Sequence, residues 1–212
     1  MKIPSKKILI PLFLLFAIIV RFVPEIGHDP VPRERFRIIK IIDGDTVELP
    51  GRDRLRLLGI DCPEKGDYFY DSASAFLSGL VLGKNPDVVF SGRRRDGYGR
   101  LLGYLYLDSI LVNEEILKNG LGYLYLFPDN VADTIHIKRL LAAQIEAIDN
   151  SRGIWSRPIA EEPFYLARKG SFRFHRPTCR SVSGLGPAAV IKFDSRPEAF
   201  KKGYSPCRNC RP

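Results

Sequence analysis

The sequence predicts a mixed α+β protein in which a small β-barrel is closed by helices and followed by a short metal-binding region. Three observations support this prediction. Short runs rich in β-branched or aromatic residues alternate with Gly- and Asp-containing turns over residues 36–107, as expected for strands. Longer stretches with apolar residues on one helical face interrupt and follow these runs. Three of the four cysteines lie after residue 174, together with a histidine.

The composition is that of a folded chain. Of the 212 residues, 45% are hydrophobic, which is enough to bury a core and excludes a fibrous or disordered protein. The net charge of +9 is uneven, because residues 165–212 carry 11 Lys and Arg against two acidic residues, and 11 − 2 = 9. A basic segment of this kind predicts a polyanionic partner such as DNA or RNA, and a merely solvated basic surface is the alternative. No protein partner is implied.

The amino-terminal segment is predicted to be a leader. Residues 8–20 are uncharged and apolar, with three lysines before them and Arg21 after them. This run suits the apolar core of a signal peptide better than a membrane-spanning helix, which needs roughly 20 residues. No small-x-small cleavage motif follows, so we expect residues 1–33 to be a signal peptide or an uncleaved membrane anchor with its linker. The basic start then predicts a protein that is secreted, periplasmic or anchored facing away from the cytoplasm. A buried core helix is the alternative.

The strands are delimited by turn signals. Asp43 and Gly44 predict a tight hairpin turn, because both residues tolerate the positive φ that such a turn requires. Pro63 is expected to end a later strand, since it lacks the N–H donor of a sheet ladder. Strands are expected over residues 36–42, 47–49, 55–60, 87–91 and 101–107.

Three helices are predicted between and after these strands. Asp71 is placed to cap a helix that has apolar residues on one face and ends at Gly83. Residues 112–119 form a short helix stopped by Gly120, and residues 133–150 form a long one stopped by Gly153.

Acidic residues gather around the predicted hairpin and the loop after the third strand. If Asp45 and Asp61 converge, they and a backbone carbonyl such as that of Cys62 offer the hard oxygen ligands that Ca²⁺ takes. Arg56, on the strand entering that loop, suggests that the anionic partner of the cation is a phosphate. A turn and a solvated loop without any ligand are the alternative.

Four blocks of the sequence resemble the staphylococcal nuclease family in order and approximate spacing. They are IDGDT (42–46), RLLGIDCPE (56–64), DGYGR (96–100) and GIWS (153–156). The resemblance implies a five-stranded OB-fold β-barrel with three helices over residues 34–156. It also implies Ca²⁺-dependent hydrolysis of phosphodiester bonds in DNA, with RNA as a second polymer. A catalytically silent OB-fold nucleic-acid-binding protein and a DNA-repair sensor led by the tail are the alternatives.

The resemblance implies roles for single residues. Asp45, Asp61 and the backbone carbonyl of Cys62 would bind Ca²⁺, although the family usually has threonine at position 62. Arg56, Glu64 and Arg100 would be the catalytic set. The two arginines would stabilise the charge that builds on the phosphate oxygens, and Glu64 would assist the attacking water. The substrate-contacting residues would be Tyr98, Tyr123 and Tyr125, with ordinary half-buried aromatics as the alternative.

The end of the chain predicts a zinc site. After a linker at residues 157–170, the segment 171–212 contains the candidate ligands His175, Cys179, Cys207 and Cys210. A Cys3His set is common in tetrahedral structural zinc sites, and a disulfide with a spare thiol is the alternative. The stretches FHRPTC (174–179) and KFDSRPEAFKKGYSPCRNC (192–210) resemble the zinc-binding domain of the bacterial Ada methylphosphotriester repair protein. That domain uses four cysteines, so His175 leaves a structural zinc site but puts methyl transfer in doubt.

Overall fold

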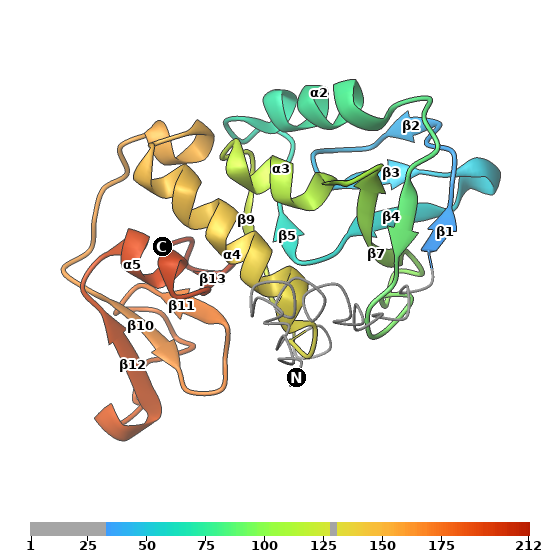
Figure 1. Ribbon diagram of the computed structural model, residues 1–212. Helices are drawn as coiled ribbons and strands as arrows, with labels where there is room; N and C mark the ends of the chain where they lie inside the picture. Colours follow the sequence, from blue (N-terminus) through green and yellow to red (C-terminus); the bar gives the residue numbers. More distant parts are fainter. Residues whose placement is uncertain (1–32, 128–130) are drawn as a thin grey trace, which may run out of the picture. The chain divides into compact units, whose positions relative to one another are not determined.

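The computed structural model of the protein describes residues 33–127 and 131–212 (Figure 1). The described residues belong to one compact unit, in which the nuclease-like domain and the predicted zinc segment pack together. The predicted leader, residues 1–33, lies outside the described residues except for Arg33. Within the described ranges, no helix is long and apolar enough to cross a membrane.

The first sheet confirms the mixed α+β class. Its strands are β1 (Arg33–Arg35), β2 (Lys40–Ile41), β3 (Thr46–Glu48), β4 (Arg54–Leu57), β6 (Asp87–Val89), β7 (Leu101–Leu107) and β8 (Ile110–Leu111). The hydrogen-bonded order is β1-β6-β7-β4-β3-β2, with β8 beside β7. Strands β4 and β7 are parallel, and the other pairs of this sheet are antiparallel. A closed five-stranded barrel remains a prediction.

The predicted strand over residues 36–42 is wrong in its first half. Residues 36–39 connect β1 to β2, because the backbone changes partners there. The N–H of Ile38 donates to Lys84 on one side (3.0 Å), and the N–H of Ile39 donates to Glu48 on the other (3.0 Å). Such a change of partner carries the chain from one edge of the sheet to the opposite edge.

The hairpin between β2 and β3 has another cause than the one predicted. Neither Asp43 nor Gly44 has a positive φ. Instead, Asp43 Oδ1 accepts from the N–H of Asp45 (3.0 Å), an Asx turn that closes the loop locally. A Cβ added to Gly44 would lie 2.6 Å from Cβ of Ala73 and 2.8 Å from Cβ of Cys62. Glycine is therefore required by close packing at this turn, not by backbone conformation.

The predicted strand over residues 55–60 is present at both ends but is wrong in the middle, because a turn at Leu58 and Gly59 breaks it. Gly59 has a φ of +80°, which lets the chain leave β4 and start β5 (Ile60–Asp61). Strand β5 pairs with β9 (Tyr123–Leu124) in a second, two-stranded sheet. The turn thus moves Asp61 away from the first sheet and toward the loops that surround the candidate site.

The three predicted helices are present, with one corrected start. They are α2 (Tyr70–Val81), α3 (Val112–Lys118) and α4 (Thr134–Asp149). The predicted cap at Asp71 is wrong, since the N-cap is Phe69 with a φ of +69°. Residues 64–67 already form a turn, in which Asp67 N–H donates to the carbonyl of Glu64 (2.8 Å), and this turn starts the helix earlier. Asp133, the first residue of the predicted range, is the N-cap of α4 and accepts from the N–H of His136 (3.2 Å).

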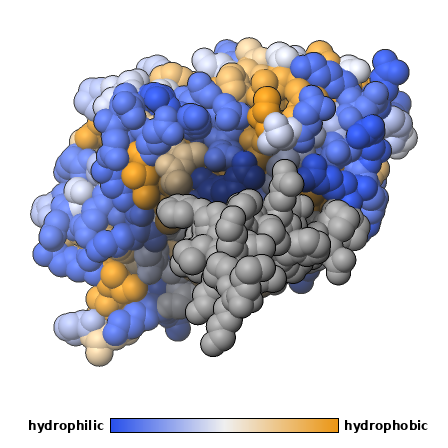
Figure 2. All heavy atoms as spheres, in the orientation of Figure 1, coloured by the Kyte–Doolittle hydropathy of each residue, from blue (hydrophilic) through white to orange (hydrophobic). Residues whose placement is uncertain are grey.

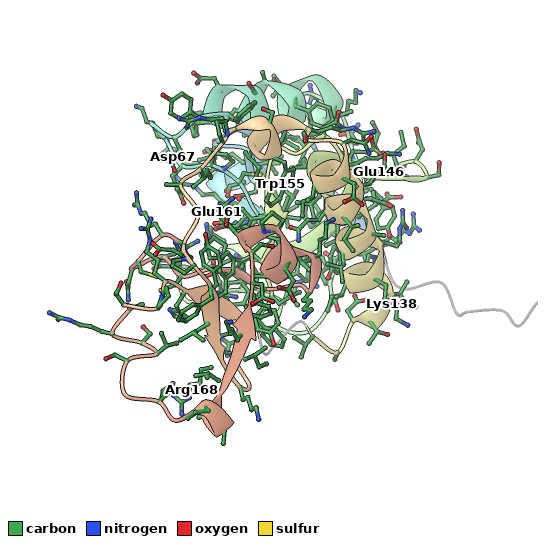
Figure 3. All side chains as sticks on the ribbon, turned by 90° about the vertical axis from the view of Figure 1, so that its left-hand side faces the viewer. Asp67, Lys138, Glu146, Trp155, Glu161 and Arg168 are labelled. Carbon is green, nitrogen blue, oxygen red and sulfur yellow. The ribbon has the colours of Figure 1, made fainter. Side chains whose placement is uncertain are left out.

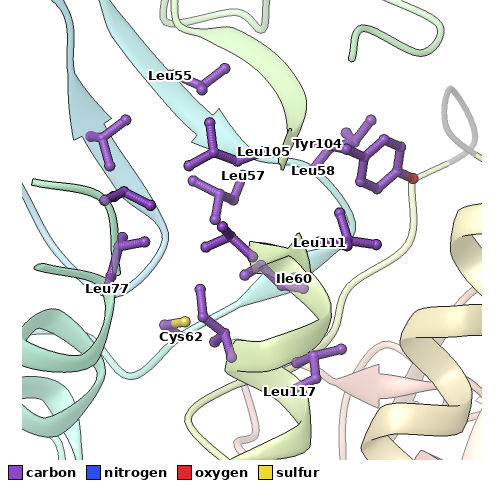
Figure 4. Close-up of a cluster of buried hydrophobic side chains, with 14 of the residues drawn as sticks. Leu55, Leu57, Leu58, Ile60, Cys62, Leu77, Tyr104, Leu105, Leu111 and Leu117 are labelled. Atoms are coloured by element: carbon purple, nitrogen blue, oxygen red, sulfur yellow. The ribbon is translucent and has the colours of Figure 1, made fainter. Parts of the chain in front are cut away.

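The main core lies between the first sheet and the helices α2 and α3. Figure 4 shows leucines of β4 and β7 meeting side chains of both helices, with the Cys62 side chain among them. Leu55, Leu77 and Leu105 are fully buried. Each such side chain contributes about 1.5–3 kcal/mol on burial, so this cluster holds the strands that carry the candidate site.

The carboxyl-terminal segment forms a third, four-stranded sheet. Its order is β12-β10-β11-β13, with strands β10 (Tyr165–Arg168), β11 (Arg173–His175), β12 (Val190–Phe193) and β13 (Ser205–Pro206). Helix α5 (Arg196–Lys201) follows β12, and the 3-10 helices are η2 (Pro50–Arg52), η3 (Gly153–Ser156) and η4 (Pro187–Ala189). We call residues 165–212 the zinc module. Strand β10 lies within residues 157–170, so the predicted linker becomes part of this sheet.

The zinc module packs on the nuclease-like domain through a second hydrophobic cluster. The indole of Trp155 contacts the ring of Phe200 edge-on, with 4.7 Å between centroids. Trp155 lies close to both parts in Figure 3. The buried Gln144 of α4 accepts from Leu124 N–H (2.6 Å) and donates to the carbonyl of Phe200 (2.7 Å). The GIWS block therefore helps to join the two parts.

Candidate active site and metal centre

A cleft of about 1020 Å³ lies beside β4, β5 and the turn at residues 96–100. It is lined by most of the residues predicted for the nuclease site, together with one residue of the zinc module, Arg208. The face of the molecule in Figure 2 is mostly hydrophilic, with small hydrophobic patches. The cleft itself is lined by arginines and carboxylates, and such a charged surface suits a charged ligand better than an apolar one.

Three predicted residues meet at the floor of the cleft. The guanidinium of Arg56 contacts Asp45 through Nη1 (3.1 Å) and Asp61 through Nη2 (2.7 Å). All three side chains are nearly buried, with exposed fractions of 11%, 8% and 7%. Arg56 also donates to the carbonyls of Leu57 and Ile60, at 3.0 and 2.9 Å. The turn at Gly59 therefore wraps around Arg56 and brings the two carboxylates to one place.

The electrostatics of this floor favour an additional cation. Burial raises the pKa of Asp45 to about 7, the charge of Arg56 opposes this shift, and the charges of Asp43 and Asp61 add to it. Because only two guanidinium groups, those of Arg56 and Arg208, face the three carboxylates, the negative charge here is not fully compensated. The carboxylates are hard oxygen donors of the kind that divalent cations such as Ca²⁺ take.

Cys62 supports the site through its backbone. Its N–H donates to Asp45 Oδ2 at 2.8 Å. Burial raises the pKa of the Cys62 thiol well above its ordinary value, so this side chain is a protonated part of the core and not a nucleophile. A backbone function is compatible with cysteine in place of threonine. The predicted ligation through its carbonyl stays a prediction.

Glu64 stands at the rim of the cleft. Its side chain is exposed, and its carboxylate has no hydrogen-bond or ion-pair partner among the described residues. Only its backbone is engaged, in the turn with Asp67. An unpaired carboxylate beside a polar cleft is available to accept a proton.

Arg100 lines the same cleft but is paired within its own turn. Its Nε donates to Asp96 Oδ2 at 2.8 Å, and its Nη2 lies 2.7 Å from the same oxygen. Asp96 also accepts from the N–H of Tyr98 and of Arg100. The DGYGR block thus forms a self-contained loop that presents Arg100, with 30% of its side chain exposed. Tyr98 is 88% exposed, and Cζ of Arg100 lies 5.4 Å from the centroid of its ring, so the rest of the ring is accessible to a ligand.

The other two predicted tyrosines differ in position. Tyr125 lines the cleft, whereas Tyr123 lies behind it and donates its hydroxyl to Asp61 Oδ2 at 2.9 Å. Burial, helped by the charge of Asp61, raises the pKa of Tyr123, so the hydroxyl remains a donor. Tyr123 therefore orients Asp61.

The four predicted zinc ligands come together. The ligand atoms of His175, Cys179, Cys207 and Cys210 all lie within 4.8 Å of one another. All four cysteines of the chain are free thiols, so the alternative of a disulfide is not formed here. Nδ1 of His175 is buried and has no hydrogen-bond partner in the described part of the chain. Three thiols and an imidazole facing one point fit a tetrahedral structural zinc site, with Zn–S distances of about 2.3 Å.

Two arginines of the zinc module were missed by the sequence reasoning. Arg208 donates from Nη2 to both oxygens of Asp61, at 3.0 and 3.3 Å. Arg173 lies over the ring of Tyr125, 3.6 Å from its centroid, and donates to the carbonyl of Leu126 at 2.9 Å. The only feature of the sequence that pointed to such contacts was the excess of basic residues in the module, and this excess does not distinguish Arg173 or Arg208 from the other basic residues.

Comparison with known proteins agrees with this arrangement. Residues 54–157 match the family described as staphylococcal nuclease homologue, and residues 153–212 match the metal binding domain of Ada. The fold and the two sites thus define a nuclease-like domain fused to a zinc-binding module. The chain belongs to the staphylococcal nuclease homologue family, and both resemblances found in the sequence are confirmed.

The chain matches several known proteins over most of their length. Protein ParB of Escherichia coli is 31% identical over 151 residues, which are 66% of this chain and 82% of the relative. An uncharacterized endonuclease of Escherichia coli O157:H7 is 33% identical over 124 residues, 57% of this chain and 76% of the relative. The thermonuclease of Staphylococcus intermedius is 29% identical over 163 residues, 69% of this chain and 95% of the relative.

Proposed function

We propose that the protein is a Ca²⁺-dependent nuclease that hydrolyses phosphodiester bonds of DNA, and of RNA as a second substrate. The observation that supports it most is the pair Asp45 and Asp61, buried at the floor of a polar cleft on one guanidinium. A protein that only binds nucleic acid needs no buried acidic pair, since it would repel the phosphate. Relatives named thermonuclease and endonuclease support the same activity.

The residues of the cleft would have different roles in catalysis. Ca²⁺ bound by Asp45, Asp61 and the carbonyl of Cys62 would act as a Lewis acid on the phosphate. Glu64 takes a proton from the attacking water, a contribution of typically 10²- to 10⁴-fold. Arg100 donates to the phosphate oxygens, whose negative charge grows toward the transition state.

Arg56 has fewer donors for a phosphate than an unpaired arginine, because most of them are used within the protein. Both hydrogens of its Nη1 are directed at the carbonyls of Leu57 and Ile60, and one of Nη2 at Asp61. A guanidinium has five N–H donors, so Nε and one donor of Nη2 remain for a substrate. We infer that Arg56 holds the two carboxylates in place and adds its remaining donors to the phosphate.

The deciding experiment is a cleavage assay with controlled metals. The purified protein is dialysed free of Ca²⁺ and incubated with plasmid DNA or with RNA of similar length, without metal, with Mg²⁺ or with Ca²⁺. Cleavage that depends on Ca²⁺ supports the proposal. Binding to DNA without cleavage under any of these conditions would contradict it and favour a silent binding module.

We also propose export. The apolar run at residues 8–20 would direct the nuclease out of the cytoplasm, either as a signal peptide or as an anchor. Extracellular Ca²⁺ would then be available, and the cell's own DNA would be protected. Fractionation of cells that express a tagged protein tests this, and enzyme confined to the cytoplasm would refute it.

A further inference from the structure

We propose that Arg208 of the zinc module is a phosphate-binding residue of the nuclease cleft, so that the module completes the substrate site. This inference rests on the proposed nuclease function. Arg208 is 147 residues away from Asp61 in sequence, yet its Nη2 contacts both oxygens of that carboxylate. It is the one residue of the zinc module that lines the cleft.

The donors of Arg208 are available to a substrate. Within the described residues, only its Nη2 makes hydrogen bonds, and its side chain is 61% exposed. Its Nε and Nη1 therefore keep three of the five N–H donors of a guanidinium free. Arg56 is the opposite case, because it is 11% exposed and donates to two carbonyls and to Asp61. Of these two arginines on Asp61, Arg208 is the more exposed and keeps more donors for phosphate oxygens.

The side chain of Arg208 is also held in position. Its Cζ lies 5.2 Å from the centroid of the Tyr125 ring, and Arg173 lies over the same ring. Arg173 in turn donates to Leu126 of the nuclease-like domain and to Ser205 Oγ of the module, at 2.9 and 2.8 Å. Less conformational entropy is lost on binding when a long side chain is fixed beforehand. Arg208 is thus a preorganised donor and not a freely moving surface arginine.

The charges that line the cleft also support a phosphate-binding role for Arg208. Six arginines and six carboxylates line it, and Arg208 is one of the six arginines. Removing it would leave five positive against six negative side chains. A polynucleotide would then meet a cleft with excess negative charge, which lowers its affinity. The zinc module therefore supplies the charge that brings the cleft to balance.

The test compares the wild-type chain with Arg208→Gln, Arg208→Lys and a matched control, Arg168→Gln. Arg168 is exposed, belongs to the same module and does not line the cleft. In Figure 3 it lies at the end of the module away from α2. Two quantities are measured: kcat/KM for DNA with Ca²⁺, and the salt dependence of oligodeoxynucleotide binding without added Ca²⁺. Zinc content and Tm show whether each variant is folded.

We expect Arg208→Gln to lower kcat/KM about 10- to 100-fold, as for the loss of a hydrogen bond to a charged group. The slope of log K against log salt should become shallower by about 0.7, the value for one phosphate contact on a single strand. Arg208→Lys should fall between wild type and Arg208→Gln, because it keeps the charge but not the planar set of five donors. Arg168→Gln should match the wild type in both measurements.

Several outcomes would overturn the inference. They are an unchanged kcat/KM and slope in Arg208→Gln, an equal loss in Arg168→Gln, or faster cleavage in Arg208→Gln. The last result would mean that Arg208 blocks the cation ligand Asp61. If Arg208→Gln loses zinc, the folded Arg208→Lys decides, and wild-type behaviour there refutes the role of the guanidinium donors. Absence of cleavage by the wild type refutes the proposed function, whereas equal cleavage by wild type and Arg208→Gln refutes only this inference.

Discussion

The nuclease cleft and the zinc site hold their polar groups in opposite ways. In the cleft, Asp45 and Asp61 are bound by the guanidinium of Arg56 and by further protein donors. In the zinc site, three thiols and His175 face one another, and Nδ1 of His175 has no partner among the described residues. Cys210 Sγ accepts from the N–H of Arg176 at 3.4 Å, but within the described ranges no charged group faces the thiols as Arg56 faces the two carboxylates. The cleft is therefore held by charged protein groups, whereas the zinc ligands need a metal ion to join them.

This difference predicts different consequences of metal removal. Ligands that are satisfied by protein groups stay in place without their cation, so loss of Ca²⁺ should stop catalysis but preserve the fold. Ligands that need a metal ion to join them do not hold one another in place when the ion is absent. The free energy of metal binding then contributes directly to the free energy of folding. Four single substitutions test this contrast between the two sites.

The largest effect is expected for loss of zinc. Cys207→Ser should unfold the zinc module, because structural zinc contributes about 10–16 kcal/mol in small zinc-binding peptides at neutral pH. Trp155 is the only tryptophan of the chain and packs on Phe200 of the module. Its fluorescence should therefore shift to longer wavelength, and residues 165–212 should become sensitive to protease.

Cys62→Ala is the control for this prediction, since Cys62 is the one cysteine outside the zinc cluster. It should keep one zinc ion per chain and the wild-type fluorescence. A Cys207→Ser variant that keeps the native spectrum and protease resistance would show that the module folds without zinc.

The second-largest effect is expected on the rate of catalysis alone, without a change in stability. Glu64→Gln should lower kcat about 10²- to 10⁴-fold, by loss of the group that accepts the proton of water. Its Tm should match the wild type, because the Glu64 carboxylate is exposed and has no partner in the described chain. Asp71→Asn, an exposed change in the first turn of α2, should leave both quantities unaltered. Unchanged turnover in Glu64→Gln would remove Glu64 from the mechanism.

Local patterns in the sequence predicted the elements that depend on local causes. Strand β7 was predicted at its observed bounds, because its apolar run sits between two turns. The break between β4 and β5 was missed, since a glycine in an apolar run does not reveal that the strand changes sheets at Gly59. The start of α2 was missed for a similar reason, because the turn from Glu64 to Asp67 replaces the expected cap at Asp71.

The candidate site was predicted where a family motif carried it and missed where a long-range contact made it. Asp45, Arg56 and Asp61 come from two short blocks that resemble the nuclease family, and they meet as expected. Arg208 meets Asp61 only because the zinc module packs against β9 and α4 through Gln144. No spacing or periodicity encodes a contact of this kind between distant segments. Whether these residues have the proposed roles stays a prediction.

The third effect tests whether the cleft is held by its own charges. Arg56→Met should destabilise the protein by about 3–5 kcal/mol, because it leaves the buried Asp45 carboxylate without its counter-charge and Asp61 with Arg208 alone. Arg54→Met, an exposed change on the same strand, should alter stability by less than about 0.5 kcal/mol. Urea denaturation measures both. Added Ca²⁺ should restore part of the stability of Arg56→Met, since a cation would replace the missing charge.

The smallest effect tests whether core packing positions the acidic turn. Gly44→Ala would bring a methyl group to 2.6 Å from Cβ of Ala73 and 2.8 Å from Cβ of Cys62. The turn must then move outward, and overpacking of this kind costs about 1–3 kcal/mol. Since Asp45 is the next residue, its carboxylate should move away from Arg56, so Ca²⁺ affinity should fall together with Tm. Gly97→Ala is the control, because nothing lies within 4 Å of its added Cβ. If Gly44→Ala kept the Ca²⁺ affinity and Tm of Gly97→Ala, packing would not position the carboxylate, and the cleft would depend on its cation as the zinc site does on zinc.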